Sequence, residues 1–186
     1  MKKTVFIVAV MVLVLSLSIT AEAKKTKIYV HQDKYPADVA SSLAAYKGKT
    51  IFLANFENNA NNTTIWYYFR PDNKKVIYEA APTLQSYVWY CFEKAMKAAG
   101  ATVYRDQAPV AVPELRLSFT SFSETEFTAR VELIKNGKSA FVKNITVTDE
   151  ATQSMDQAEL EERAYEQMDK IIKGVMLEPD LKKAFF

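Results

Sequence analysis

The clearest structural signal in this sequence is the stretch from residue 82 to residue 100, PTLQSYVWYCFEKAMKAAG. Apolar residues recur within it at spacings of three and four, the period of one buried helix face; they are Leu84, Val88, Cys91, Ala95 and Ala98. Pro82 suits a first helical turn, and Gly100 supplies the left-handed conformation that commonly ends a helix. Trp89, Phe92 and Met96 widen the apolar stripe, so we expect other elements to cover this helix on more than one side.

Three strands are predicted after this helix. Apolar residues alternate with polar ones at Leu115, Leu117 and Phe119, and again at Phe127, Ala129, Val131 and Leu133. The turn that follows contains Asn136 and Gly137. A two-residue turn would place polar side chains of the third strand on the core side. A three-residue loop with a glycine bulge instead brings in Phe141, Ile145 and Val147 and places Lys143 opposite Val131, and we prefer that register.

Further elements are predicted on both sides of this region. They are a short strand at 28–30, a helix at 37–46 with Val39, Leu43 and Tyr46 on one face, a buried strand at 50–56, a hairpin of 65–69 with 76–78, a last helix that begins near Ser154 or Asp156 and carries Leu160, Ala164, Met168, Ile171 and Val175, and an exposed turn at 180–186. Together these elements predict an α+β fold, a single domain in which a mostly antiparallel sheet is packed by two main helices.

The first 23 residues have the three parts of a secretory signal peptide. Lys2 and Lys3 are followed by an apolar run at 5–17, and then by the small residues of Ala21-Glu22-Ala23. The run is shorter than the roughly 20 apolar residues of a membrane span. Cleavage after Ala23 would leave residues 24–186 as the periplasmic or secreted α+β domain. Lys24 stands where a lipoprotein has its lipidated Cys, so we expect no permanent membrane anchor.

Composition excludes several classes of protein. Hydrophobic residues make up 49% of the chain, and 24 basic residues nearly balance 22 acidic ones. Disordered chains and strongly basic nucleic-acid binders have other compositions. One His, one Cys and four Gly cannot supply a multi-His metal site, a disulfide framework or a glycine-rich phosphate loop. We therefore expect no cofactor, no metal and no nucleic-acid partner.

The residues that could carry a reaction are few. His31 and Asp33 are too few for a metal site, and Cys91 falls on the buried face of the predicted helix, where it acts as a small hydrophobe. Glu124 and Glu126 lie two apart, and paired carboxylates are the catalytic groups of glycosidases. They also lie at a break between strands, where exposed charges protect a sheet edge, and this second interpretation is the stronger. We predict that the protein is not an enzyme.

The aromatic strand Ile65–Phe69, IWYYF, is the least ordinary feature of the chain. It is either a fully covered central strand or a surface that docks a partner or an apolar ligand, because Trp and Tyr offer a large contact area with a polar end. We name Trp66, Tyr68 and the neighbouring Asn61 and Asn62 as the partner-binding residues.

The order of these elements resembles that of small bacterial envelope proteins. The segments that carry the likeness are Thr50–Phe56, Pro82–Val103 and Pro113–Leu117. In these segments the chain resembles the auxiliary lipoprotein component of envelope ABC-type transporters. The resemblance implies a non-catalytic periplasmic subunit that binds envelope proteins or lipids beside a transport or assembly machine. The missing lipidated Cys departs from that pattern.

Three functions are therefore weighed. The first is a periplasmic binding or adaptor protein with an envelope protein as its partner. The second is a carrier that holds an acyl chain or another apolar ligand near Trp89, Phe92 and Met96. The third is a hydrolase that depends on the carboxylates of Glu124 and Glu126.

Overall fold

The computed structural model describes residues 26–60, 65–69, 75–152, 154 and 156–186, and for strand β4 it describes the backbone. The predicted signal peptide and two of the predicted contact residues, Asn61 and Asn62, lie outside the described residues. The elements are β1 (Thr26–His31), η1 (Gln32–Lys34), η2 (Asp38–Tyr46), β2 (Thr50–Leu53), β3 (Glu57–Asn58), β4 (Ile65–Phe69), β5 (Lys75–Ala81), α2 (Leu84–Ala98), β6 (Thr102–Tyr104), β7 (Glu114–Phe122), β8 (Glu126–Lys135), β9 (Lys138–Thr148), α3 (Gln157–Met176) and α4 (Pro179–Phe185).

The predicted α+β class is confirmed, and the strands form two mixed sheets where one mostly antiparallel sheet was expected. The smaller sheet has the order β1-β5-β4, and the larger has the order β6-β2-β7-β8-β9, with β3 also paired to β7. β1 joins β5 in parallel, as do β2 and β3 with β7. The parallel pairs arise because a helix or a long connection separates their strands in sequence.

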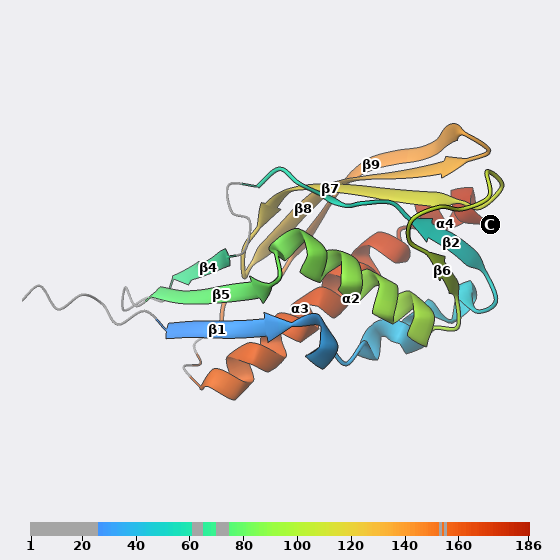
Figure 1. The fold of residues 1–186 in the computed structure, drawn as a ribbon. Coiled ribbons are helices and arrows are strands. Elements are labelled where there is room, and N and C mark those ends of the chain that lie inside the picture. The colour runs from blue at the N-terminus through green and yellow to red at the C-terminus, as the bar shows by residue number, and fades with distance from the viewer. Residues whose placement is uncertain (1–25, 61–64, 70–74, 153, 155) are drawn as a thin grey trace, which may run out of the picture.

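The helix α2 lies at the centre of the molecule (Figure 1). The Thr83 side chain caps its start by accepting a hydrogen bond from the Ser86 N–H, so Pro82 precedes the helix and is not part of its first turn. Leu84, Val88, Cys91 and Ala95 are buried as predicted, together with Phe92 and Met96, whereas Ala98 at the end of the predicted face is exposed. α2 contacts β5 and β6, and α3 contacts β1 and β9, so this pair of helices joins the two sheets around one core.

The predicted register of the β8–β9 hairpin is confirmed from Leu133 onward, but the predicted three-residue loop is wrong. Lys135 pairs with Lys138 across a two-residue turn, and the bulge lies within the strands, between Leu133 and Ile134. Phe141 lies opposite Leu133, Ile145 opposite Ala129, and Lys143 opposite Val131, with the irregularity next to the turn. Asn136 and Gly137 both adopt a positive φ, which their residue types tolerate. Lys143 therefore sits in a row of core-facing positions on β9. Its ammonium group reaches Glu178 at 2.6 Å, so the charge is not left unpaired.

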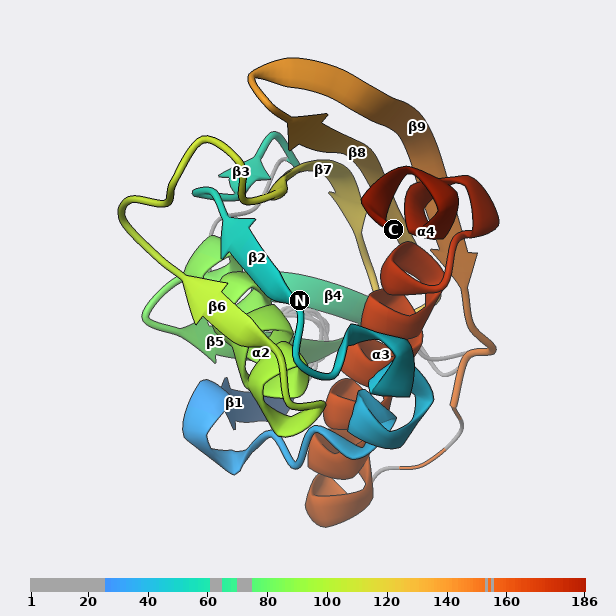
Figure 2. The ribbon, with the colours of Figure 1, turned by 90° about the vertical axis from the view of Figure 1, so that its right-hand side faces the viewer.

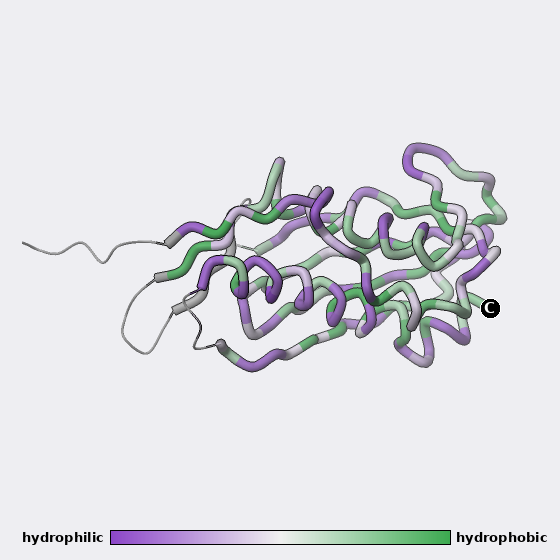
Figure 3. Tube along the Cα trace, turned by 90° about the horizontal axis from the view of Figure 1, so that it is seen from below, coloured by the Kyte–Doolittle hydropathy of each residue, from purple (hydrophilic) through white to green (hydrophobic). Residues whose placement is uncertain are grey.

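The helix α3 begins where the sequence predicts. Asp156 caps it by accepting hydrogen bonds from the Ala158 and Glu159 N–H groups. The first turns of α3 carry mostly hydrophilic residues, and its later turns include more apolar ones (Figure 3). Leu160, Ala164, Met168, Ile171 and Val175 are all buried.

Three local predictions differ from the structure. The segment 37–46 forms a 3-10 helix whose Leu43 departs from helical geometry, although its predicted apolar face is buried. The predicted strand 50–56 ends at Leu53 as β2. The short strand β3 lies beyond the predicted strand, at Glu57–Asn58, and both strands pair with β7. Residues 180–186 were expected to be an exposed turn, but they belong to α4, which buries Leu181 and Phe185 against the larger sheet and Tyr46 (Figure 2).

No described helix combines the length and the apolar character that a membrane span requires.

Candidate functional site

The candidate nucleophile and the candidate imidazole do not form a catalytic unit. Cys91 is fully buried inside α2. Burial raises the pKa of its thiol, and the hydrogen bond with Tyr87 offsets that rise only in part. His31 instead caps η1, where its Nδ1 accepts a hydrogen bond from the Asp33 N–H at 3.3 Å. A thiol in this environment is held in its protonated, unreactive form.

Glu124 and Glu126 occupy two different environments. Glu124 is 3% exposed, and its Oε1 accepts hydrogen bonds from Arg163 Nε at 2.8 Å and from the Thr152 N–H at 3.2 Å. Burial nonetheless raises the pKa of Glu124. Glu126 is exposed at the start of β8. The expectation that both are exposed edge charges is therefore wrong for Glu124, which ties the β7–β8 turn to α3.

The residues proposed to hold an apolar ligand are part of the packed interior. Phe92 and Met96 are fully buried in the core, and Phe92 packs edge-on against Phe56 at 5.2 Å between ring centroids. Trp89 is partly exposed, and its indole N–H donates to the Ala54 carbonyl at 3.0 Å. Protein neighbours fill the space around Phe92 and Met96, so no room is left there for an apolar ligand. The structure therefore does not favour the carrier hypothesis.

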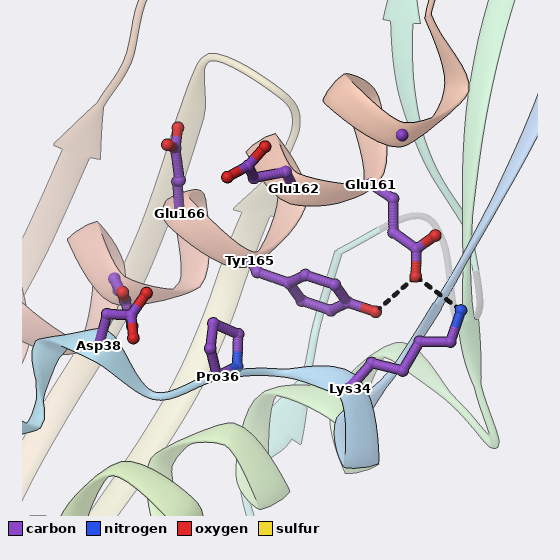
Figure 4. A pocket seen from close by; sticks show the side chains of 9 residues that line it. Lys34, Pro36, Asp38, Glu161, Glu162, Tyr165 and Glu166 are labelled. Atoms are coloured by element: carbon purple, nitrogen blue, oxygen red, sulfur yellow. Dashed lines mark hydrogen bonds and ion pairs between the residues drawn. The ribbon is translucent and has the colours of Figure 1, made fainter.

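A cleft of about 310 Å³ lies between the N-terminal segment and the first half of α3 (Figure 4). Its charged and aromatic lining comprises Lys34 and Asp38 from the N-terminal side and Glu161, Glu162, Tyr165, Glu166 and Asp169 from α3. Glu161 accepts hydrogen bonds from Lys34 Nζ at 2.9 Å and from the Tyr165 hydroxyl at 3.0 Å. The cleft thus contains five carboxylates and one ammonium group, and its net charge attracts cations.

Two side chains that line this cleft, Tyr165 and Asp169, have raised pKa values. Burial raises the pKa of Tyr165, and the bond to Glu161 adds to that rise. Burial also raises the pKa of Asp169, although the hydrogen bond donated by the Tyr35 hydroxyl opposes the rise. Within the described residues, no group of three or more His, Cys, Asp and Glu side chains could hold a metal ion. The arrangement is suited to fixing the N-terminal segment on α3.

The strand that carries two of the predicted contact residues lies at the edge of the smaller sheet. β4 pairs with β5 on one side, and in the described part of the chain it is the last strand on the other side. Position 66 lies opposite Tyr78 and position 68 opposite Val76, and both of these β5 residues are buried. Position 67 lies opposite Ile77. The contact role of Trp66 and Tyr68 remains a prediction.

The larger sheet ends in another edge strand of different character. β9 is 11 residues long and pairs with β8 along its length. Val142 is exposed on one face of β9. On the core-facing side the row of apolar residues is interrupted by Lys143, which is paired with Glu178. Lysine on an edge strand discourages the addition of another strand. β9 therefore has a protection that β4, with no charged residue, does not have.

Sequence reasoning missed the cleft on α3 and the environment of Glu124. The acidic residues of α3 give no local sign of a cleft, because Glu162 and Glu166 are exposed, as charged residues on a helix surface usually are. Nothing in the spacing of residues 34–38 indicates that they lie across from α3. Arg163 is part of the polar pattern of α3, but its pairing with Glu124 depends on how the β7–β8 turn meets the helix.

Comparison with known proteins shows a fold and no family. No family model and no curated protein matches the chain. An uncharacterised protein of known structure aligns with a TM-score of 0.55 and 13% identity, over 82% of this chain and 98% of that one. Protein XCC0632 from Xanthomonas campestris, described under the family name DUF330, aligns with a TM-score of 0.51 and 10% identity, over 74% and 92% of the two chains. Lipoprotein GNA1162 from Neisseria meningitidis gives a TM-score of 0.32 at 12% identity, over 68% of this chain and 98% of that chain.

Proposed function

We propose that this chain is a non-catalytic periplasmic adaptor that binds an extended segment of an envelope protein along β4. The observation that carries this proposal is the position of β4 at the edge of its sheet. The five residues of β4 include no charge, no Gly and no Pro. Natural proteins usually shield such an edge, and an extended peptide can add to it through main-chain hydrogen bonds.

The contrast with β9 supports the choice of β4. Both are edge strands, but only β9 carries a lysine among its core-facing positions. A partner strand that added to β9 would meet the Lys143–Glu178 pair, whereas one that added to β4 would meet an uncharged strand. Trp66 and Tyr68 would then supply aromatic contact area beside the backbone pairing, and Asn61 and Asn62 would lie next to it in sequence.

The location of this activity follows from the predicted signal peptide. Cleavage after Ala23 would release the chain into the periplasm without a lipid, so attachment to a membrane machine would depend on protein contacts. The resemblance to transporter auxiliary components makes an envelope transport or assembly system the expected partner.

The test is photocrosslinking in cells from position 66 or 68 of the exported protein, with mass spectrometry of the adducts. The matched control carries the same crosslinker at Val142, which is 43% exposed on the protected edge strand. A discrete envelope-protein adduct from position 66 or 68, and none from position 142, is the expected result. Equal adducts from both edges, adducts to lipid alone, or no adduct would overturn the proposal.

A second variant separates binding from folding. Trp66→Ala should weaken capture of the crosslinked partner and leave the melting temperature nearly unchanged. A large fall in melting temperature would instead assign Trp66 to the core and move the contact surface elsewhere.

A further inference from the structure

A second cleft lies beside the first half of α2, and its lining is different from that of the cleft between residues 34–38 and α3. It has a volume of about 270 Å³ and is bordered by the chain that follows β2, the first turns of α2 and the residues after β6. The lining residues that matter here are Asn55, Gln85, Trp89, Tyr90, Arg105 and Asp106. None of the functions weighed from the sequence uses this cleft as a whole.

Two aromatic rings form the apolar part of the cleft. Trp89 and Tyr90 meet edge to face, with 5.1 Å between their ring centroids and an interplanar angle of 88°. The Trp89 indole N–H is already used, because it donates to the carbonyl groups of Ala54 at 3.0 Å and Leu53 at 3.3 Å. The Trp89 side chain is therefore fixed before any ligand binds. It can contact a ligand through its ring carbons, but it has no free hydrogen-bond donor. A fixed ring loses little conformational entropy on binding.

The charges around the cleft balance. Arg105 donates to both carboxylate oxygens of Glu93, and Lys97 lies 2.8 Å from the same carboxylate. Arg105 also lies 5.5 Å from the centroids of the Trp89 and Tyr90 rings. Of these charged groups only Arg105 lines the cleft, and the cleft's other charged lining residue is Asp106, so the lining has one positive and one negative group. It therefore has no net charge with which to select an ionic ligand.

Hydrogen-bonding groups remain free for a ligand. Among the described residues, the Tyr90 hydroxyl and the Asn55 side-chain amide have no hydrogen-bond partner. Gln85 donates through Nε2 to the Phe56 carbonyl, which leaves its Oε1 free to accept. A wholly apolar ligand would remove water from these groups and give no hydrogen bond in return. The cleft therefore fits a ligand that is neutral, carries hydroxyl groups and has an apolar face.

We propose that this cleft binds one ring of a neutral sugar. The C–H face of the sugar would lie against the Trp89 ring, with the perpendicular Tyr90 ring at its side, and its hydroxyl groups would exchange hydrogen bonds with Asn55, Gln85 and the Tyr90 hydroxyl. The site does not involve β4, so a negative result for sugar binding would not bear on the proposed adaptor function, and the reverse also holds. The volume suits one ring, and a longer glycan would extend from it over the surface.

Tryptophan fluorescence can test the site directly, because the chain has only two tryptophans, Trp66 and Trp89. In the Trp66→Phe variant, Trp89 is the sole reporter. Glucose, N-acetylglucosamine, maltotriose and chitotriose are the probes. We expect at least one of them to change the emission in a saturable way, and Tyr90→Ala or Asn55→Ala to weaken that binding by about tenfold. Tighter binding of a trisaccharide than of its monosaccharide identifies a glycan chain as the source, and equal binding identifies a free sugar.

Matched controls make the result decisive. Asn144→Ala removes an amide from the exposed side of β9, outside the cleft, and should bind as the parent does. Glucose 6-phosphate and glucosamine should bind no tighter than glucose, because the cleft has no net charge. Calorimetric titration of the natural chain replaces fluorescence if Trp66→Phe does not fold.

Four results would overturn the proposal. The first is no response to any of the four sugars up to about 50 mM, the second is binding of a charged analogue about tenfold more tightly than glucose, and the third is a response to the neutral peptide acetyl-tetraalanine amide with none to the sugars. Unchanged binding in both Tyr90→Ala and Asn55→Ala would also place the sugar elsewhere.

Discussion

Gly174 of α3 faces Val147 of β9 so closely that a β-carbon at position 174 would lie 2.6 Å from Val147 Cγ2. Glycine inside a helix ordinarily costs about 0.5–1 kcal/mol relative to alanine. Here the missing side chain lets α3 approach the larger sheet. The close packing of α3 on β9 therefore explains why a glycine occupies position 174, although glycine is a poor helix former.

Gly174→Ala should destabilise the protein, although alanine is the better helix former. We expect the free energy of unfolding in urea to fall by about 1–3 kcal/mol, because the new methyl group overpacks the contact. Adding Val147→Ala should recover part of the loss by removing the γ-methyl group that clashes. An increase in stability for Gly174→Ala alone would contradict the close packing.

Glu124→Gln should be costly because Arg163 would lose its carboxylate partner. The Arg163 side chain is only 19% exposed, so its charge would be poorly compensated by water. We expect the free energy of unfolding to fall by about 2–3 kcal/mol, less than for a fully buried pair, because Asp149 lies 3.9 Å from the Arg163 guanidinium.

The control for this variant is Glu126→Gln, two residues along the chain and exposed. Its unfolding free energy should stay within about 0.5 kcal/mol of the parent value. If both variants kept full stability and both abolished a hydrolytic activity of the purified protein, the carboxylates would be catalytic and the structural role of Glu124 would be wrong.

The spacing of apolar residues predicted those elements whose buried face repeats along one segment of the chain. The buried face of α2, the start of α3 at Asp156 and the bulged register around Lys143 all follow from spacings within one segment or one hairpin. These features depend on neighbours in sequence, and an amphipathic pattern records which side of an element is buried.

Long-range pairings were not predictable in the same way. Sequence spacing does not indicate that the 3-10 segment at 38–46 and α4 meet through Tyr46 and Phe185, or that β2 and β3 share one edge of β7. α4 was assigned to the surface because its two buried residues are too few for a clear period. Glu124 was misplaced since its burial depends on Arg163, 39 residues away in sequence.

Cys91 should be unreactive in the folded protein. Its thiol is fully buried and burial raises its pKa, so the thiolate that attacks alkylating agents is scarce. We expect no modification by iodoacetamide at pH 8 in native buffer and complete modification in denaturant, measured by intact mass. Rapid labelling of the native protein would mean that α2 opens readily or that Cys91 has a chemical role.

Glu93 should make part of the stability depend on acidity. Burial opposes its ionisation, but the hydrogen bonds from Arg105 and Lys97 outweigh burial and lower the pKa of the carboxyl group. A carboxyl group whose pKa is lower in the folded state stabilises the protein above its unfolded pKa of about 4.3, and that stabilisation is lost as the pH falls through the folded pKa.

The measurement compares the unfolding free energy of the parent and Glu93→Gln from pH 7 down to pH 3. At pH 7 we expect the variant to be less stable by about 1.5–3 kcal/mol, the range for hydrogen bonds to charged groups. The difference should shrink as the pH falls below about 4.3, because the parent then also loses the charge. Glu162→Gln, an exposed change on α3, should show no such trend. A difference that stays constant with pH would mean that Glu93 contributes through packing, and that the charge balance beside Trp89 does not depend on its ionisation.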